Sequence, residues 1–247
     1  MSINLGIGFY DWAGVAVTTG LTTDIFYGGR TITSETTSAV TASYYNFARA
    51  SAEIPDFCYL VGANIMAARD VGGSPVLKIQ GSAFSDYHTI LTYSLPITAS
   101  NLSGPNGEDL LFYDIAVSAF QYWRVRIETT ATVNHKWGNL YFGQSFDFGR
   151  DPVFPEDLNR LKSSKRDKRG GYSIVLRYED ISLAKKLEFN SSIMKWADAK
   201  PIVLFSRGAY DPVTDNRITI NCMIKEARWK VTGWGRFDLT LELVELI

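Results

Sequence analysis

Apolar and polar side chains alternate along much of the first part of the chain, as they do in β-strands that have one buried and one exposed face. The clearest case is the segment 122–128, where one face carries Trp123, Val125 and Ile127 and the other carries Arg124, Arg126 and Glu128. Further short strands are predicted over residues 56–62, 74–80, 86–93, 110–116 and 139–142. Many short strands separated by Gly, Ser, Asn and Pro turns predict an antiparallel β-sandwich or jelly roll.

The second part of the chain predicts a mixed, α+β arrangement of antiparallel strands with one helix. A helix is expected to begin at Asp180 or Ser182, either of which can cap it, and to end near Ala199. Its apolar face is expected to combine Leu183, Leu187, Met194 and Ala197. Strands are predicted over residues 172–178, 201–207, 218–225 and 229–246, the last with period-two alternation from Phe237 to Leu243. The whole chain is therefore expected to be mainly β.

A punctuated, charged stretch separates the two parts. Residues 149–171 contain two prolines, a Gly pair and a run of basic side chains, so they are predicted to form a surface connector. The basic residues of this connector are Arg160, Lys162, Lys165, Arg166, Lys168 and Arg169. The predicted domains are accordingly a β-sandwich over residues 1–148 and an α+β domain over residues 172–247.

Charge divides the chain in the same way. Residues 1–148 hold 7 Lys+Arg and 12 Asp+Glu, a balance of −5, whereas residues 149–247 hold 18 and 14, a balance of +4. The basic connector could bind phosphates by counterion release. Because the formal net charge of the chain is only −1, a solvated connector is the favoured interpretation, and no specific nucleic-acid partner is predicted.

The composition, with 46% hydrophobic and 21% charged residues, is that of a folded protein. Cys58 and Cys222 each lie in an apolar stretch, which favours two buried thiols over a disulfide. The first residues lack the positive charge of a signal peptide, and no stretch has the roughly 20 apolar residues of a membrane span. We therefore expect synthesis in a cytoplasm and no membrane insertion.

A search for catalytic chemistry favours no enzyme class. His88 and His135 are the only histidines, and neither has a second metal ligand at a typical spacing, so both are predicted to be ordinary surface or partly buried residues. No nucleophile elbow, phosphate-binding loop or dinucleotide fingerprint is present in the sequence. An acid pair brought together by the fold would leave a glycoside hydrolase open. The prediction is a protein without catalytic residues, cofactor or metal.

Aromatic residues are abundant, at 13% of the chain, and are the remaining candidates for a ligand site. A platform of exposed rings could stack on sugars. Trp137 follows a polar tripeptide and is the best candidate for an exposed ring, with Tyr141 beside it in sequence, whereas Trp123 is expected in the core. Packing remains the favoured interpretation of most of these rings.

Several segments resemble a known family. The runs 45–50, 56–64, 75–82, 122–127 and 138–143 look like a galactose-binding-like (discoidin-type) jelly roll, and leave residues 1–40 without a counterpart. The continuation through 148–152, a Gly-Gly strand, a helix, 200–205 and a terminal strand is similar to minor tail proteins of long-tailed bacteriophages, of the distal-tail or tail-tip type. The order of the two parts departs from that of distal tail proteins, in which the ring-forming domain comes first.

This resemblance implies a structural virion protein of the tail tip or baseplate. It implies a ring, of six copies, that joins the tail tube to the host-recognition apparatus, with the tube, hub and tape-measure proteins as partners. Residues 172–247 would form the ring and residues 1–148 a peripheral jelly roll. The alternative is a carbohydrate-binding adhesin that recognises host glycans through Trp137 and Tyr141.

Overall fold

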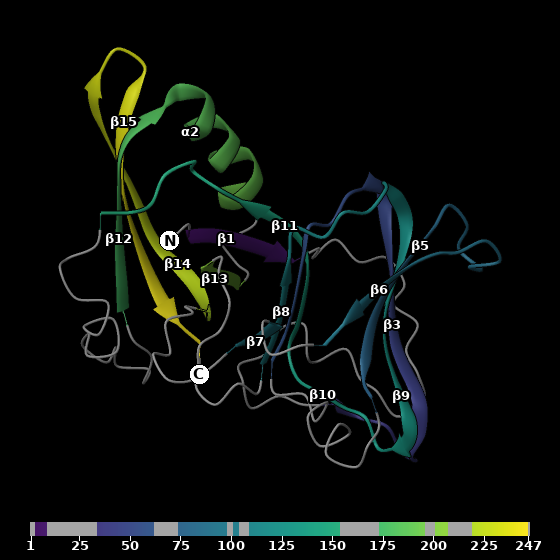
Figure 1. The fold of residues 1–247 in the computed structure, drawn as a ribbon. Coiled ribbons are helices and arrows are strands. Elements are labelled where there is room, and N and C mark those ends of the chain that lie inside the picture. Colours follow the sequence, from purple (N-terminus) through teal and green to yellow (C-terminus); the bar gives the residue numbers. More distant parts are fainter. Residues whose placement is uncertain are drawn as a thin grey trace. The chain divides into compact units, whose positions relative to one another are not determined.

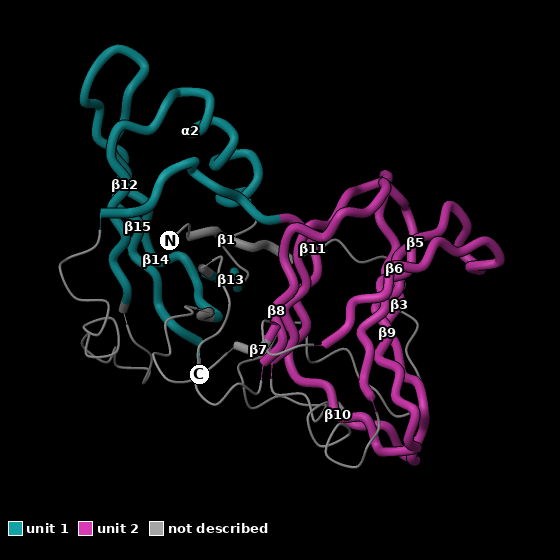
Figure 2. The backbone as a smooth tube through the Cα atoms, in the orientation of Figure 1, with its two compact units in different colours: residues 1–7, 145–208, 217–247 teal, residues 8–144, 209–216 magenta. Residues whose placement is uncertain are grey.

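The computed structural model of the 247-residue chain describes residues 3–8, 34–61, 74–97, 101–103, 109–153, 173–195, 201–206 and 219–246. The chain divides into two compact units (Figure 2). Unit 1 comprises residues 1–7, 145–208 and 217–247, and unit 2 comprises residues 8–144 and 209–216. Within the described residues the fold is mainly β with one α-helix, as the sequence predicts.

Unit 2 contains two four-stranded antiparallel arrays, β3-β9-β5-β6 and β11-β4-β8-β7, and a short pair, β10-β2. The first array consists of β3 (Val40–Glu53), β9 (Phe120–Val133), β5 (Val76–Ser82) and β6 (Leu91–Pro96). The second consists of β11 (Leu140–Phe146), β4 (Phe57–Leu60), β8 (Asp109–Tyr113) and β7 (Leu102–Ser103). The short pair consists of β10 (Lys136–Trp137) and β2 (Ser34–Glu35).

The core of unit 2 lies between these two arrays. Along β9 the inward face carries Trp123, Val125 and Ile127, all buried, as the alternation predicts. Phe142 of β11 meets Trp123 edge to face, with the ring centroids 5.7 Å apart. Because strands of both arrays contribute buried apolar residues to one cluster, the unit is a β-sandwich.

Unit 1 is an antiparallel sheet with a helix on one face (Figure 1). Its strand order is β12-β15-β14-β13-β1. The strands are β1 (Ile3–Gly8), β12 (Ser173–Ser182), β13 (Ile202–Ser206), β14 (Thr219–Gly233) and β15 (Arg236–Glu245). Leu239, Leu241 and Leu243 point inward from β15, in agreement with the predicted alternation.

The first strand corrects the predicted domain boundary. β1 pairs antiparallel with β13, from Ile3 opposite Ser206 to Gly6 opposite Val203. The sequence interpretation placed residues 1–148 in one domain, but β1 belongs to the sheet of unit 1. Pairing between strands about 200 residues apart leaves no local pattern in the sequence, which explains the error.

The helix is shorter than predicted and presents a different face. α2 spans Leu183–Phe189 and continues as a π-helical turn, η4 (Asn190–Met194). Ser182 caps it, as predicted, by accepting a hydrogen bond from the backbone N–H of Lys185. Leu183 and Leu187, expected to be inward, are 47% and 58% exposed, while Phe189 and Ile193 are buried. Ala197 lies outside the described residues. Leu183 and Leu187 precede the π-turn, so their exposure follows from the regular part of the helix, in which Phe189 and not the two leucines faces the core.

The two last strands also differ from the prediction. Residues 229–246 were predicted as one strand, but Trp229–Gly233 ends β14, and a two-residue turn of Trp234 and Gly235 leads into β15. Gly235 has φ +64°, the left-handed region that favours glycine. The Trp-Gly pair carries none of the Asn or Asp that mark most two-residue turns, so the break was missed.

The two cysteines are free and buried, which confirms the prediction of two thiols. Burial raises the pKa of both thiols above the ordinary range. The connector residues Arg160, Lys162, Lys165, Arg166, Lys168 and Arg169 lie outside the described residues.

Candidate interaction surface

Strand β12 contains a bulge just before the N-terminus of α2. The register between β12 and β15 shifts between Tyr178 and Ile181, and Asp180 within this bulge has φ +54°. A left-handed conformation is costly for a residue with a side chain, by about 1 kcal/mol or more, and persists where surrounding contacts hold it. The bulge turns the chain from β12 into the N-terminus of α2.

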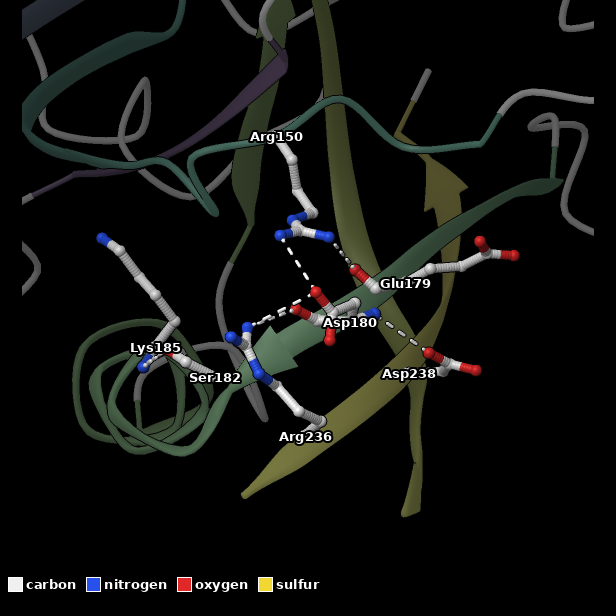
Figure 3. Close-up of polar contacts among 7 residues, drawn as sticks. All are labelled: Arg150, Glu179, Asp180, Ser182, Lys185, Arg236 and Asp238. Atoms are coloured by element: carbon white, nitrogen blue, oxygen red, sulfur yellow. Dashed lines mark hydrogen bonds and ion pairs between the residues drawn. The ribbon is translucent and has the colours of Figure 1, made fainter. Parts of the chain in front are cut away.

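Polar contacts hold Asp180 in place (Figure 3). Its backbone N–H donates to the Asp238 carboxylate, with N and Oδ1 3.0 Å apart, and its own carboxylate lies 3.4 Å from both Arg150 and Arg236. Arg150 also donates to the Glu179 carbonyl oxygen at 2.9 Å. Exposed ion pairs contribute only about 0–1 kcal/mol each, so the role of this cluster is to fix geometry.

The same contacts tie the β14–β15 hairpin to the helix. Arg236 is the first residue of β15, and its guanidinium also donates to the Asp180 carbonyl oxygen at 3.3 Å. The backbone N–H of Leu183, the first residue of α2, donates to the carbonyl oxygen of Gly235 at 3.0 Å. The end of the hairpin is therefore held against a capped helix terminus.

An apolar surface lies at this end of the hairpin. We call Val231 and Trp234 the hairpin tip; Val231 is 70% exposed and Trp234, at 104%, has no cover at all. Leu183 and Leu187, four residues apart on α2, add exposed apolar area beside the turn. A fully exposed Trp adjoining other exposed apolar residues is typical of a protein–protein contact surface.

One face of the β14–β15 hairpin is apolar along its length, from the core to the tip. Trp229 pairs with Leu239 and Val231 pairs with Phe237, so all four share one face of the hairpin. The Lys186 ammonium lies over that face, 4.0 Å from the centroid of the Phe237 ring and 5.3 Å from that of Trp229. Phe189 continues the layer, 5.9 Å from Trp229. Burial therefore decreases from the core outward along one apolar face.

Cationic groups surround the hairpin tip, and most of them are paired. Arg228 binds Glu226, Arg236 binds Asp180, and Lys185 binds Glu188 at 2.9 Å. The guanidinium of Arg228 lowers the pKa of the Glu226 carboxyl. Lys230 has no ion-pair partner within the described part of the chain. Lys230 lies opposite Asp238 in the register of β14 and β15, and its positive charge is next to Val231 of the hairpin tip.

The predicted sugar-stacking rings are not exposed. Trp137 is 0% exposed and Tyr141 is 2% exposed, so the prediction that Trp137 carries an open ring is wrong. Trp137 meets Tyr45 edge to face at 5.0 Å, and Tyr141 stacks on Tyr59 at 6.0 Å. The polar residues before Trp137 suggested exposure, but His135 among them is itself buried. Neither ring has a free face for a pyranose.

His135 instead belongs to a buried hydrogen-bond chain. The indole N–H of Trp137 donates to Ser43 Oγ at 2.7 Å, and Ser43 Oγ lies 2.8 Å from Nδ1 of His135. The other ring nitrogen lies 3.1 Å from Thr129 Oγ1, whose hydroxyl donates to the Ala131 carbonyl. Since the Thr129 proton is used there, Nε2 of His135 carries the hydrogen and Nδ1 accepts from Ser43. Every proton in the chain has an acceptor only when His135 is neutral.

Burial lowers the pKa of His135, which agrees with this neutral form. Ser43 is 0% exposed, so the Ser–His pair has no access to a substrate. His88, in contrast, is exposed and pairs with Asp86, and this hydrogen bond lowers the pKa of the Asp86 carboxyl. The structure thus places one histidine on the surface, as predicted, and buries the other more deeply than predicted.

The described residues contain no group of three or more His, Cys, Asp or Glu side chains positioned to hold a metal ion. No helix within the described ranges is long and apolar enough to cross a membrane. No protein-family model matches the chain, and no curated protein matches it.

Proposed function

We propose that this protein is a structural, ring-forming subunit of a bacteriophage tail tip, which joins the tail tube to the host-recognition apparatus. The observation that carries the proposal is the hairpin tip: Trp234 is fully exposed and Val231 is 70% exposed, at the end of a hairpin whose Gly235 carbonyl accepts from the backbone N–H of Leu183. Such a surface suits a subunit that is completed by its neighbours. The resemblance of the sequence to minor tail proteins supplies the setting.

The division of charge supports assembly from identical copies. Counted by unit, unit 2 holds 7 Lys+Arg and 13 Asp+Glu, a balance of −6, and unit 1 holds 18 and 13, a balance of +5. The opposition is therefore sharper between the units than between the two parts of the linear sequence. Opposite charge on two parts of one chain favours head-to-tail association, which can close into a ring.

In this proposal unit 1 forms the wall of the ring, and unit 2 lies at its periphery, where it can contact unit 1 of the neighbouring copy. The partners are further copies of the chain, six in all, together with the tube, hub and tape-measure proteins, and the location is the virion tail tip. The glycan-binding alternative loses its two proposed rings, since Trp137 and Tyr141 are buried.

The proposal is tested by the mass and shape of the purified protein. Multi-angle light scattering at concentrations from about 1 to 100 μM is expected to show growth from 27.6 kDa to about six times that mass. Negative-stain electron microscopy of the largest species is expected to show closed rings. A monomer over the whole range, which also does not join tail particles when these assemble in its presence, would contradict the proposal.

A further inference from the structure

Unit 2 carries a second exposed apolar cluster, in the connection between β5 and β6. Phe84 is 48% exposed, Ile90 is 38% exposed and Leu91 is 47% exposed. We call these three residues the β5–β6 cluster. Among the described residues of unit 2, Ile54 is the one other large hydrophobic side chain that is comparably exposed. Within the described residues of unit 2, the large exposed apolar side chains are thus concentrated in this connection and the first residue of β6.

The backbone holds this connection in a defined shape. Tyr87 has φ +57°, its N–H donates to the Phe84 carbonyl, and its hydroxyl donates to the Trp123 carbonyl in the core. The Arg124 guanidinium lies 4.3 Å from the centroid of the Tyr87 ring. The Phe84 ring packs on His88, 4.0 Å between centroids. Phe84 is therefore displayed by an anchored loop, as Trp234 is displayed by an anchored hairpin.

We propose that copies of this chain associate head to tail, with the hairpin tip of one copy seated on the β5–β6 cluster of the next. Both surfaces are apolar and preorganised, which limits the entropy lost on docking. They belong to units of opposite charge, +5 and −6. The contact joins two different surfaces, so it leaves each copy with one free tip and one free cluster until a ring closes.

Charged groups of opposite sign lie at the margins of the two surfaces. Lys230 lies next to the hairpin tip in β14, and Asp86, which pairs with His88, lies between Phe84 and Ile90 in sequence with its side chain 67% exposed. Opposite charges at the rim of an interface steer association more than they add to affinity. The apolar residues are thus expected to set the dissociation rate, and Lys230 the salt dependence of the association rate.

This inference rests on the proposed function, because it names the surfaces through which the ring closes. Its first test compares matched serine variants by light scattering. Trp234→Ser and Phe84→Ser are each expected to raise the half-assembly concentration at least tenfold, since each removes an aromatic anchor. Val153→Ser and Ile54→Ser, which alter half-exposed apolar side chains (both 50%) elsewhere in the same two units, are the controls and are expected to assemble like the wild type.

The outcomes separate the inference from the proposed function. If Trp234→Ser assembles at the same concentration as Val153→Ser, the ring uses another surface: the inference is overturned and the proposed function stands. If the wild type is a monomer throughout, both fail. Circular dichroism and the unfolding midpoint of each variant establish that its fold is retained, as is expected for side chains that are half or fully exposed.

Disulfide trapping tests the pairing directly. The Trp234→Cys and Leu91→Cys variants are purified separately, with affinity tags of different length so that a heterodimer can be told from a homodimer on a gel, and are then mixed under mild oxidation. Cys58 and Cys222 are 0% exposed, so neither competes. A cross-linked heterodimer is expected in the mixture. A disulfide-linked dimer of Trp234→Cys alone, formed as fast as in the mixture, would indicate a tip-to-tip contact and overturn the head-to-tail arrangement.

Discussion

Replacing Ser43 by Ala would break the buried hydrogen-bond chain of unit 2 at its centre. Ser43 Oγ is the acceptor of the Trp137 indole N–H at 2.7 Å and lies 2.8 Å from His135 Nδ1. All three residues are at most 2% exposed, so water cannot replace the lost partner without entering the core. One substitution thus leaves one donor and one acceptor unsatisfied.

The expected cost follows from these two groups. A buried polar group without a partner costs about 1–3 kcal/mol, so Ser43→Ala, which leaves two such groups, is expected to destabilise unit 2 by about 2–6 kcal/mol. This is a large fraction of the 5–15 kcal/mol that stabilises a typical domain. The control is Ser94→Ala, on the exposed side of β6, which is expected to change stability by no more than about 0.5 kcal/mol.

Native-state hydrogen exchange followed by mass spectrometry suits this measurement, because the chain has two units and a single unfolding transition is not assured. Peptides from β3 and β9 are expected to exchange about 30-fold to about twenty thousand-fold faster in Ser43→Ala, and peptides from β15 in unit 1 at the wild-type rate. If the β9 peptides exchange at the same rate in Ser43→Ala and Ser94→Ala, the hydrogen-bond chain does not stabilise the unit and the reasoning is wrong.

Three further predictions concern pH, core packing and the turn. Burial lowers the pKa of His135 in the folded state below its ordinary value of 6.5, so the unfolded state takes up a proton first as the pH falls. The free energy of unfolding is therefore expected to be highest above pH 6.5 and to fall below it, by up to about 1.4 kcal/mol per pH unit. Urea unfolding midpoints between pH 7.5 and 5 check this, and His135→Gln should flatten the dependence. Phe189→Ala is expected to lower the free energy of unfolding of unit 1 by about 3–5 kcal/mol in urea, whereas Leu187→Ala, on the same helix but 58% exposed, should lower it by less than about 1 kcal/mol. Equal losses would mean that Phe189 is not the buried residue of the helix. Gly235→Val is expected to cost about 1–2 kcal/mol because of the left-handed φ and not because of a clash, since no atom lies within 4 Å of the added Cβ, so Gly235→Asn should recover part of the loss in the same assay.

Local patterns in the sequence predicted the strands whose two faces differ strongly. The alternation in β9 and β15 identified their buried faces correctly, because each strand has one face in a core and the other in water. The Ser182 cap was predicted for the same reason: an N-cap depends on residues three positions apart.

The errors occurred where the structure depends on distant residues or on irregular backbone. Phe189, and not Leu183 and Leu187, faces the core from the helix, and the partner of β1 lies about 200 positions away. Trp137 was predicted to be exposed from its polar neighbours, yet His135 among them is buried, because Ser43 and Thr129 on other strands form hydrogen bonds with both of its ring nitrogens. The hairpin tip was missed because Trp234 was assigned to a strand interior, where an aromatic residue is ordinary.

The pairing of β1 with β13 has a consequence for the order of events during synthesis. A ribosome adds about 5–20 residues per second, so roughly 10–40 s pass between the emergence of Ile3 and that of Ser206. The strands of the unit 2 sandwich are all translated within this interval, so unit 2 can fold while the sheet of unit 1 still lacks its central strands. Strand β1 thus joins its partner only after residues 202–206 have been made, and a ribosome that stalls before residue 202 leaves the sheet of unit 1 without β13, β14 and β15.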